Sequence, residues 1–402
     1  MIKIINMPAQ SVSPDWLSAE AALARLGVAR QTLYAYVSRG LVRTCRAMDD
    51  PRRSLYDPRS IDALLERRGR GRARRVVAAS TIDFGEPVLV SRITQIANGT
   101  LLYRGHDAIA LAQTATLEET AALLWEASPL PDLADSGFVP CDGLTPLARC
   151  LHRIASLPSP SIWSRSPAVL IADAATLLRR IAEAATNTFA DGPLHQALAQ
   201  AWGVDTCGAG LIRRGLVLCA DHELNASTFA VRVVASTGAA LPACLLAGLA
   251  ALTGPLHGGM TERVAAFLAE PGMAADPRGA IEARLSRGDR LPGFGHRLYP
   301  DGDPRAEALL ADLELGPWWR AMLRGVRDLT GLRPNIDLAL VALERECRLP
   351  SGSALAIFAI GRAVGWIAHA LEQNADGQLI RPRATYAAAS SGRDRQNHTK
   401  HE

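Results

Sequence analysis

The stretch ALAIFAIGRAVGWIAHAL, residues 354–371, decides the fold. By length and apolar content it could cross a membrane, but it contains Arg362 and His369, which are costly to bury in lipid. We therefore predict a buried helix in the core of a soluble protein. A second apolar stretch, 241–252, is too short to span a bilayer and predicts another buried helix.

The helical pattern extends from this stretch over most of the chain. From about residue 107 to 374 one helix follows another, punctuated by proline and glycine. Aromatic residues form only 5% of the composition, which favours helices over a β-sandwich. Residues 84–110 alternate short apolar runs with Gly and Asn turns and predict a few small strands. The sequence thus predicts an all-α fold, and 402 residues allow two or three domains.

The N-terminal region differs in charge from the rest of the chain. Residues 1–80 carry 15 Lys and Arg against 7 Asp and Glu, whereas the remainder carries 29 against 33. A basic module on a slightly acidic body is typical of nucleic-acid binding. A solvated basic linker is the alternative explanation.

The pattern of residues 16–65 predicts a winged helix-turn-helix. Ser18 is a candidate N-cap for a first helix that Gly27 ends, and a second helix is expected from about 29 to 38. Strands around 41–43 and 52–56 would form a basic hairpin, and a third helix follows Pro58. Side chains that could reach bases or phosphates are Arg30, Gln31, Thr32, Tyr34, Arg43, Arg52 and Arg53.

Cysteine usage argues for a reducing compartment. Seven cysteines are scattered without a CxxC pair, so we expect neither a disulfide framework nor a metal site. The N-terminus also lacks the charged leader and apolar segment of a secretory signal. The sequence predicts a cytoplasmic protein that makes no membrane contact.

Two histidines lie in glycine-rich turns, where backbone can approach a ligand closely. His257 follows an apolar helix in GPLHGG (254–259), and His296 closes GFGH (293–296). A third, His222, lies in what reads as a helical stretch. Any one of them could instead be a hydrogen-bonded structural residue.

Three further positions carry charge in unusual contexts. Asp337, in PNID (334–337), begins an apolar helix and could serve simply as a helix cap. Arg362 lies within the very apolar helix and needs an anionic partner, either a protein carboxylate or a substrate carboxylate. Arg381 belongs to a rigid basic pair with Arg383.

These motifs, in this order, resemble the citrate synthase family. The matching segments are LLYRGHDAIALAQTATLEETAALLW (101–125), ADHELNASTFAVRVVAST (220–237), GPLHGG, GFGHRLYPDGDPRA, PNID, FAIGRAVGWIAHALEQ and IRPRATY. The resemblance covers about residues 84–386. Residues 16–68 resemble, less specifically, the winged helix-turn-helix of mercury-resistance-type regulators.

The resemblance implies a helical homodimer that joins acetyl-CoA, or propionyl-CoA in a 2-methylcitrate synthase, to oxaloacetate without a metal or other cofactor. Asp337 would be the base, His257 would stabilise the enolate, and His296 would polarise the oxaloacetate carbonyl. The substrate carboxylates would be held by His222, Arg305, Arg362 and, reaching across the dimer, Arg381.

The implied organisation is a winged module over 1–68 with a disordered start, a Gly/Arg linker over 69–80, and a disordered tail over 387–402. A large domain would comprise 81–256 and 346–386, and a small domain 257–345. Met260, Thr261 and Pro300 depart from common family residues near CoA. Two other readings stay open: a DNA-binding metabolite sensor that reuses the fold, or a module that only mediates protein contacts.

Overall fold

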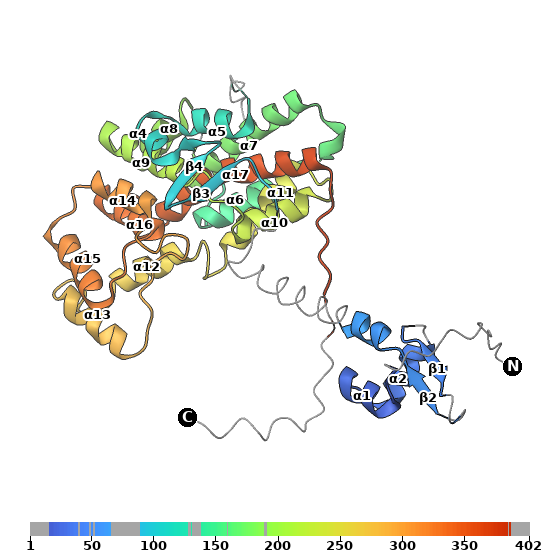
Figure 1. Cartoon of the computed structure of the whole chain (residues 1–402). Coiled ribbons are helices and arrows are strands. Elements are labelled where there is room, and N and C mark those ends of the chain that lie inside the picture. The colour runs from blue at the N-terminus through green and yellow to red at the C-terminus, as the bar shows by residue number, and fades with distance from the viewer. Residues whose placement is uncertain are drawn as a thin grey trace. The chain divides into compact units, whose positions relative to one another are not determined.

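The computed structural model describes residues 16–38, 41–47, 50, 53–65, 89–127, 130, 138–158, 160–188, 191–384 and 386. The chain divides into two compact units, Met1–Val90 and Ser91–Glu402 (Figure 1). Arg52, the predicted linker over 69–80 and the predicted tail over 387–402 lie outside the described residues. Each unit is considered by itself below.

The described part of the first unit contains two helices and a hairpin, followed by helical residues 58–65: α1 (Ala19–Leu26), α2 (Arg30–Ser38), β1 (Thr44–Arg46) and β2 (Ser54–Tyr56). Ser18 caps α1 by accepting a hydrogen bond from the Ala21 N–H, and Gly27 ends it in the left-handed conformation. A small core of its own joins these elements, formed by Ala22, Leu26, Leu33, Val42, Tyr56, Ile61 and Leu64.

The hairpin begins later than the sequence suggests. The N–H groups of Leu41 and Val42 both donate to the Tyr36 carbonyl, which closes a turn after α2. The predicted strand at 41–43 is therefore wrong, and pairing starts at Thr44 opposite Tyr56. The order helix, turn, helix, hairpin, helix agrees with the sequence prediction.

The second unit is almost entirely helical, apart from one small antiparallel sheet of order β3-β4-β5. Its elements are β3 (Thr94–Ala97), β4 (Thr100–Tyr103), β5 (His106–Asp107), α4 (Ala108–Thr114), α5 (Leu117–Trp125), α6 (Pro146–Ala155), η1 (Ile162–Ser164), α7 (Pro167–Thr186), α8 (Leu194–Trp202), α9 (Thr206–Leu218), α10 (Ala226–Ala235), α11 (Leu241–Leu252), α12 (Met260–Leu268), α13 (Pro277–Ser286), α14 (Pro304–Ala311), α15 (Pro317–Thr330), α16 (Ile336–Glu346) and α17 (Ser353–Asp376).

Helix α17 is the centre of this unit. It contacts α5, α6, α7, α9, α10, α11 and α16, and in Figure 1 it runs as the red helix through the middle of the bundle. Its length and composition would fit a membrane span, but 94% of its most apolar window is buried inside the structure. Gly248 and Gly365 permit its close packing, because a Cβ there would collide with Trp366 or with Asp221. The predicted core helix is thus observed.

Helices α12 to α15 lie to one side of the bundle in Figure 1, joined to it through α16. Helix α13 packs on α15, while α12 and α14 both pack on α16. This arrangement brings three segments together at the N-terminal end of α16: the loop of residues 293–296, the loop of residues 333–335, and Asp303 at the start of α14. The sequence had suggested a helical position for His222, which is wrong. Helix α9 ends at Leu218, and Asn225 caps α10, so His222 lies in the loop between them.

Candidate functional site

The site begins where two loops are joined at the start of α16. Phe294 and Pro334 form an isolated antiparallel bridge. The Gly295 N–H donates to the Arg333 carbonyl at 2.8 Å, and the Asn335 N–H donates to the Gly293 carbonyl at 2.9 Å. Gly293 has a φ of 83°, and a Cβ there would lie 2.7 Å from Val264 Cγ2. Glycine is therefore required to bring the loop of His296 beside the loop of Asp337.

His296 is held as a neutral imidazole of defined tautomer. The Leu298 N–H donates to its Nδ1 at 3.2 Å, so the proton of the neutral ring is on Nε2. Burial, followed by the positive charge of Arg305, lowers its pKa to about 4. The ring can therefore donate a hydrogen bond from Nε2 at neutral pH.

His257 lies in the turn between α11 and α12. The turn requires glycine at 258, since a Cβ there would lie 2.4 Å from the Leu252 carbonyl oxygen. Nε2 of His257 lies 2.8 Å from the Ser227 hydroxyl. The oxygen of that hydroxyl also accepts a hydrogen bond from the Trp366 indole at 3.1 Å. Burial and the charge of Arg362 lower the His257 pKa to about 4, so this ring is also neutral.

Asp337 is not the cap of α16. Asn335 has that role, because its side-chain oxygen accepts hydrogen bonds from the N–H groups of Asp337 and Leu338. The Asp337 carboxylate is thus free of the capping function that the sequence left open. Burial raises its pKa to about 6, partly offset by the positive charges of Arg305 and Arg362.

Arg305 is buried and already paired. Its Nε and Nη2 donate to the two carboxylate oxygens of Asp303 at 2.9 and 2.8 Å. Asp303 also accepts the Ile336 N–H at 3.0 Å, so one carboxylate ties α14 to the start of α16. The pairing raises the pKa of Arg305 despite its burial. Sequence reasoning missed Asp303, although it stands two residues before Arg305 in a quoted motif.

Arg362 is buried on α17 with its guanidinium 4.9 Å from the Phe358 ring centroid. Its Nε donates to the Cys219 carbonyl at 2.8 Å. Among the described residues, no carboxylate lies within ion-pair distance of Arg362. Burial lowers its pKa, while the charge of nearby Asp221 opposes that shift. Of the two partners that the sequence left open, a protein carboxylate is not in direct contact.

His222 is the remaining predicted residue that lies beside His296. It is buried, and burial together with the charges of Arg305 and Arg362 holds its pKa well below the usual range. His296 and His257 act on it in the same direction, so these four groups all lie within electrostatic reach of His222. Its Nε2 lies 3.0 Å from the hydroxyl of Tyr299, and its ring meets the His296 ring edge-on at 5.1 Å. Sequence reasoning assigned no role to Tyr299, although it lies three residues after His296.

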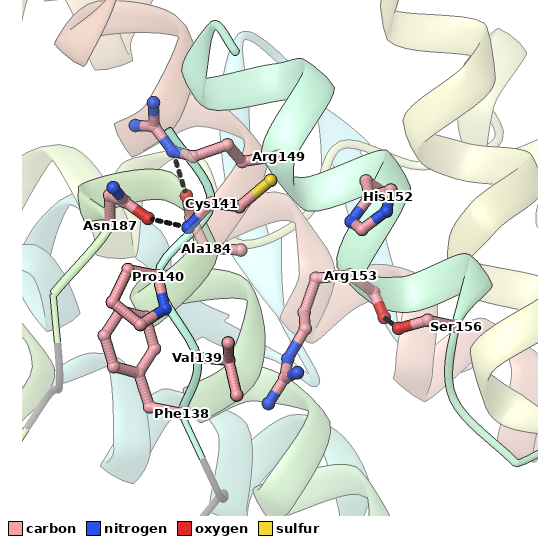
Figure 2. Close-up of a pocket in the computed structure, with 10 residues that line it drawn as sticks. All are labelled: Phe138, Val139, Pro140, Cys141, Arg149, His152, Arg153, Ser156, Ala184 and Asn187. Carbon is pink, nitrogen blue, oxygen red and sulfur yellow. Dashed lines mark hydrogen bonds between the residues drawn. The ribbon is translucent and has the colours of Figure 1, made fainter. Parts of the chain in front are cut away.

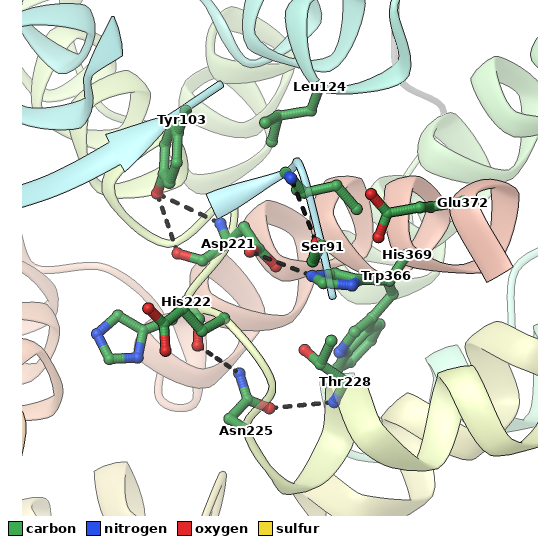
Figure 3. A network of polar contacts seen from close by, with 12 residues as sticks. Ser91, Tyr103, Leu124, Asp221, His222, Asn225, Thr228, Trp366, His369 and Glu372 are labelled. Atoms are coloured by element: carbon green, nitrogen blue, oxygen red, sulfur yellow. Dashed lines mark hydrogen bonds and ion pairs between the residues drawn. The ribbon is translucent and has the colours of Figure 1, made fainter. Parts of the chain in front are cut away.

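The loop of His222 rests on a buried polar network (Figure 3). The preceding residue, Asp221, lies 3.4 Å from Nε2 of His369, and its backbone contacts the Tyr103 hydroxyl. His369 Nδ1 lies 3.2 Å from Arg232 Nη1. Arg232 in turn is paired with Glu372 and Asp376 and bonds Gln373. These contacts anchor the loop to α10 and α17.

The remaining predicted residues lie elsewhere. Arg381 is exposed in the segment after α17. In the first unit, Arg30, Gln31, Tyr34, Arg43 and Arg53 are exposed and Thr32 is half-buried. Arg52 lies outside the described residues.

A separate pocket contains none of the predicted residues (Figure 2). It lies between α6, the end of α7 and residues 138–141. Its lining comprises Phe138, Val139, Pro140, Cys141, Arg149, His152, Arg153, Ser156, Ala184 and Asn187. Arg149 donates to the carbonyls of Ala184, Ala185 and Leu144. Its positive charge therefore stabilises the C-terminal end of α7, where the helix dipole is negative.

Comparison with known proteins identifies the family of the second unit. Residues 151–383 match the family model for the citrate synthase C-terminal domain. The chain is 41% identical over 182 residues to putative citrate synthase 2 of Mycobacterium bovis, covering 42% of this chain and 49% of that protein. It is 35% identical over 186 residues to 2-methylcitrate synthase 1 of Corynebacterium glutamicum, covering 43% and 48%.

The structure resembles the crystal structure of citrate synthase from Thermotoga maritima with a TM-score of 0.63 and 26% identity. That similarity covers 76% of this chain and 95% of the other. The sequence matches span about half the length of these curated relatives. Since the family model covers more than half of the chain, this protein belongs to the citrate synthase family.

Proposed function

We propose that this protein condenses acetyl-CoA with oxaloacetate to give citrate and CoA. One observation carries the proposal: Asp337, His257 and His296 each lie within electrostatic reach of Arg305, Arg362 or both, with both imidazoles neutral and the carboxylate of raised basicity. A carbon acid, a carbonyl acceptor and two substrate carboxylates need this combination of base, hydrogen-bond donors and cations.

Asp337 is the proposed base. The methyl protons of an acetyl thioester are weakly acidic, so a carboxylate of pKa near 6 is a better acceptor than an ordinary one. It remains largely ionised at neutral pH. The developing negative charge moves from the carboxylate to the thioester oxygen as the enolate forms.

His257 is the proposed donor to that oxygen. The Ser227 hydroxyl has one proton to donate and two acceptors within hydrogen-bond distance, Asn225 Oδ1 at 2.7 Å and His257 Nε2 at 2.8 Å. Asn225 Oδ1 already accepts two backbone N–H groups. If the hydroxyl donates to His257 Nε2, the proton of the neutral ring is on Nδ1, where it can stabilise the enolate.

His296 is the proposed acid at the ketone. Its Nε2–H polarises the oxaloacetate carbonyl and transfers a proton to the oxygen as the enolate carbon attacks. The new carbon–carbon bond gives citryl-CoA. Water then cleaves the thioester, which releases citrate and CoA.

The carboxylates of oxaloacetate are assigned to cations and to His222. Two Arg305 nitrogens are held by Asp303, which leaves Nη1, whereas Arg362 uses only Nε on a carbonyl. Arg362 is therefore the better candidate for a paired hydrogen bond to one carboxylate. Arg381 is exposed in the segment after α17, and we assign it to a site in a second copy, in a homodimer.

The proposed active site lies between a large domain of residues 81–256 and 346–386 and a small domain of residues 257–345. Closure of the small domain would exclude water and align the two substrates. We place the enzyme in the cytoplasm, in line with the scattered cysteines.

Propionyl-CoA is the alternative acyl donor, and one of the matched relatives is named a 2-methylcitrate synthase. The test is release of free CoA by the full chain with oxaloacetate and either acyl-CoA. Faster release with acetyl-CoA supports the proposal, and faster release with propionyl-CoA supports the variant. If neither thioester gives release above that of an Asp337→Asn protein, the enzymatic proposal is wrong.

A second function is supported by the first unit. It folds around its own core, and Arg30, Arg43, Arg46, Arg53 and Arg59 are all exposed on it. Arg30, Gln31 and Tyr34 are exposed on α2, whereas Leu33 is buried. Exposed side chains of this kind on a helix could contact a DNA groove. We propose that the unit binds DNA and that substrate binding to the second unit regulates it.

The test is a fluorescence anisotropy titration of the full chain with duplex from its own upstream region, at two salt concentrations. Oxaloacetate and CoA are then added separately. Binding that falls with salt and changes with either ligand supports the regulator. Absence of binding at low salt would leave protein contacts as the role of this unit.

A further inference from the structure

Tyr299 stands out among the buried polar groups that the proposed reaction does not use. It is 2% exposed, and among the described residues its hydroxyl has one hydrogen-bond partner, Nε2 of His222 at 3.0 Å. Its ring lies 5.0 Å from the His296 ring and 5.7 Å below the Arg305 guanidinium. One side chain thus contacts three residues assigned to the oxaloacetate site.

The backbone fixes Tyr299 relative to His296. The Tyr299 N–H donates to the His296 carbonyl at 3.0 Å, and the Gly302 N–H donates to the Tyr299 carbonyl at 3.1 Å. Tyr299 therefore belongs to the same rigid turn as His296, whereas His222 comes from the loop between α9 and α10. The hydrogen bond between Tyr299 and His222 joins two separate elements across the site.

The direction of that hydrogen bond follows from acid–base chemistry. Burial raises the pKa of Tyr299 to about 12, so the phenol keeps its proton, and the pKa of His222 is held low enough for a neutral ring. An imidazole nitrogen is more basic than a phenol oxygen, and a phenol is more acidic than an imidazole N–H. The favoured arrangement is Oη–H donating to Nε2, which leaves the ring proton on Nδ1.

We propose that Tyr299 is a positioning residue for the oxaloacetate site: it fixes the orientation and tautomer of His222 and so presents Nδ1–H as the ring's only donor to a substrate oxygen. The inference rests on the proposed function and deepens it. Tyr299 itself does not touch the reacting atoms, so its removal should affect oxaloacetate binding more than turnover.

The decisive variant is Tyr299→Phe in the full chain. Loss of one hydrogen bond predicts about a tenfold rise in KM for oxaloacetate, with kcat within about threefold. In a His222→Leu background the same substitution should change KM by less than about twofold, since the ring through which it acts is absent. An equal effect in both backgrounds, or tighter oxaloacetate binding by Tyr299→Phe, would overturn the proposal.

A second measurement does not depend on catalysis. Nitrogen-15 NMR of histidine-labelled protein should assign His222 to the Nδ1–H form, with the signal moving or broadening in Tyr299→Phe. Tyr103→Phe is the matched comparison. Among the described residues, that hydroxyl contacts backbone groups alone, at the end of α9 and at Asp221 in the His222 loop, so its loss should lower the thermal midpoint without changing the tautomer. A His222 proton on Nε2 would reject the proposal even if CoA is released, and a wild-type protein that releases no CoA would reject the proposed function alone.

Discussion

The two units of this protein place their charges in opposite ways. In the first unit, a core of seven buried side chains supports arginines that project into solvent. In the second unit, Arg232, Arg305 and Arg362 are 1–2% exposed, and buried histidines and carboxylates surround them. The Arg25–Asp62 pair, with side chains 47% and 45% exposed, contrasts with the Arg232–Glu372 pair at 1% and 16%.

The difference matters because water screens the first set of charges and not the second. Exposed charges act at long range, depend on salt and contribute little to stability individually. Buried charges shift each other's pKa values, and removing one partner of a buried pair leaves the other at a large cost. Mutations should therefore have large, specific effects in the second unit and small, salt-dependent effects in the first.

The largest expected effect is on turnover. Asp337→Asn keeps the shape of the side chain but removes the base, so kcat should fall by about 10³-fold or more. The thermal midpoint should stay or rise, because a carboxylate that burial disfavours is replaced by a neutral amide. Activity within tenfold of wild type would mean that another group removes the proton.

The next effect is on stability. Arg232→Met removes a buried guanidinium from half-buried Glu372 and from Asp376, whose side chain is 50% exposed, and should reduce the free energy of unfolding by about 2–3 kcal/mol. Urea denaturation followed by circular dichroism measures it. If the loss is under about 1 kcal/mol, these buried charges behave like exposed ones and the contrast between the units fails.

The pH dependence gives a smaller, graded effect. The base acts when ionised, so activity should be lost as the pH falls through about 6, the pKa of Asp337. At pH 5 the rate would be about tenfold below its plateau. Both imidazoles have pKa values of about 4 and stay neutral over that range. An acid limb near 4 in kcat/KM would indicate that Asp337 is not perturbed.

A smaller effect is expected on DNA binding. Arg30→Ala and Arg43→Ala should each weaken binding to a duplex about three- to tenfold and reduce the slope of log K against log salt by about one. Anisotropy titrations at several salt concentrations measure both. Unchanged binding in the double variant would assign the first unit to protein contacts.

The smallest expected effect is that of the exposed pair. Arg25→Ala removes the contact to Asp62 at 2.9 Å and should cost less than about 1 kcal/mol of stability, less again in high salt. Measured beside Arg232→Met by the same denaturation, it provides the matched control for burial. A loss as large as that of Arg232→Met would show that exposure does not separate the two pairs.

Periodicity and local signals predicted much of the fold. The apolar stretch became α17, Ser18 and Gly27 bound α1 as expected, and the small strands occur within 94–107. Errors arose where one backbone contact decided between alternatives. The Tyr36 carbonyl holds residues 41 and 42 in a turn, where a strand was expected. Asn225 caps α10, so the helix begins after His222 and does not include it.

The sequence by itself determined the candidate residues for the proposed chemistry: glycine-flanked His257 and His296, Asp337 at a helix start, and an arginine within an apolar helix. Only the tertiary structure decided how they act together. It assigned the cap of α16 to Asn335, paired Arg305 with Asp303, and placed Tyr299 against His222. The physical reason is that a pKa, a tautomer and an ion pair depend on neighbours distant in sequence, whereas helix formation depends on neighbours a few residues away.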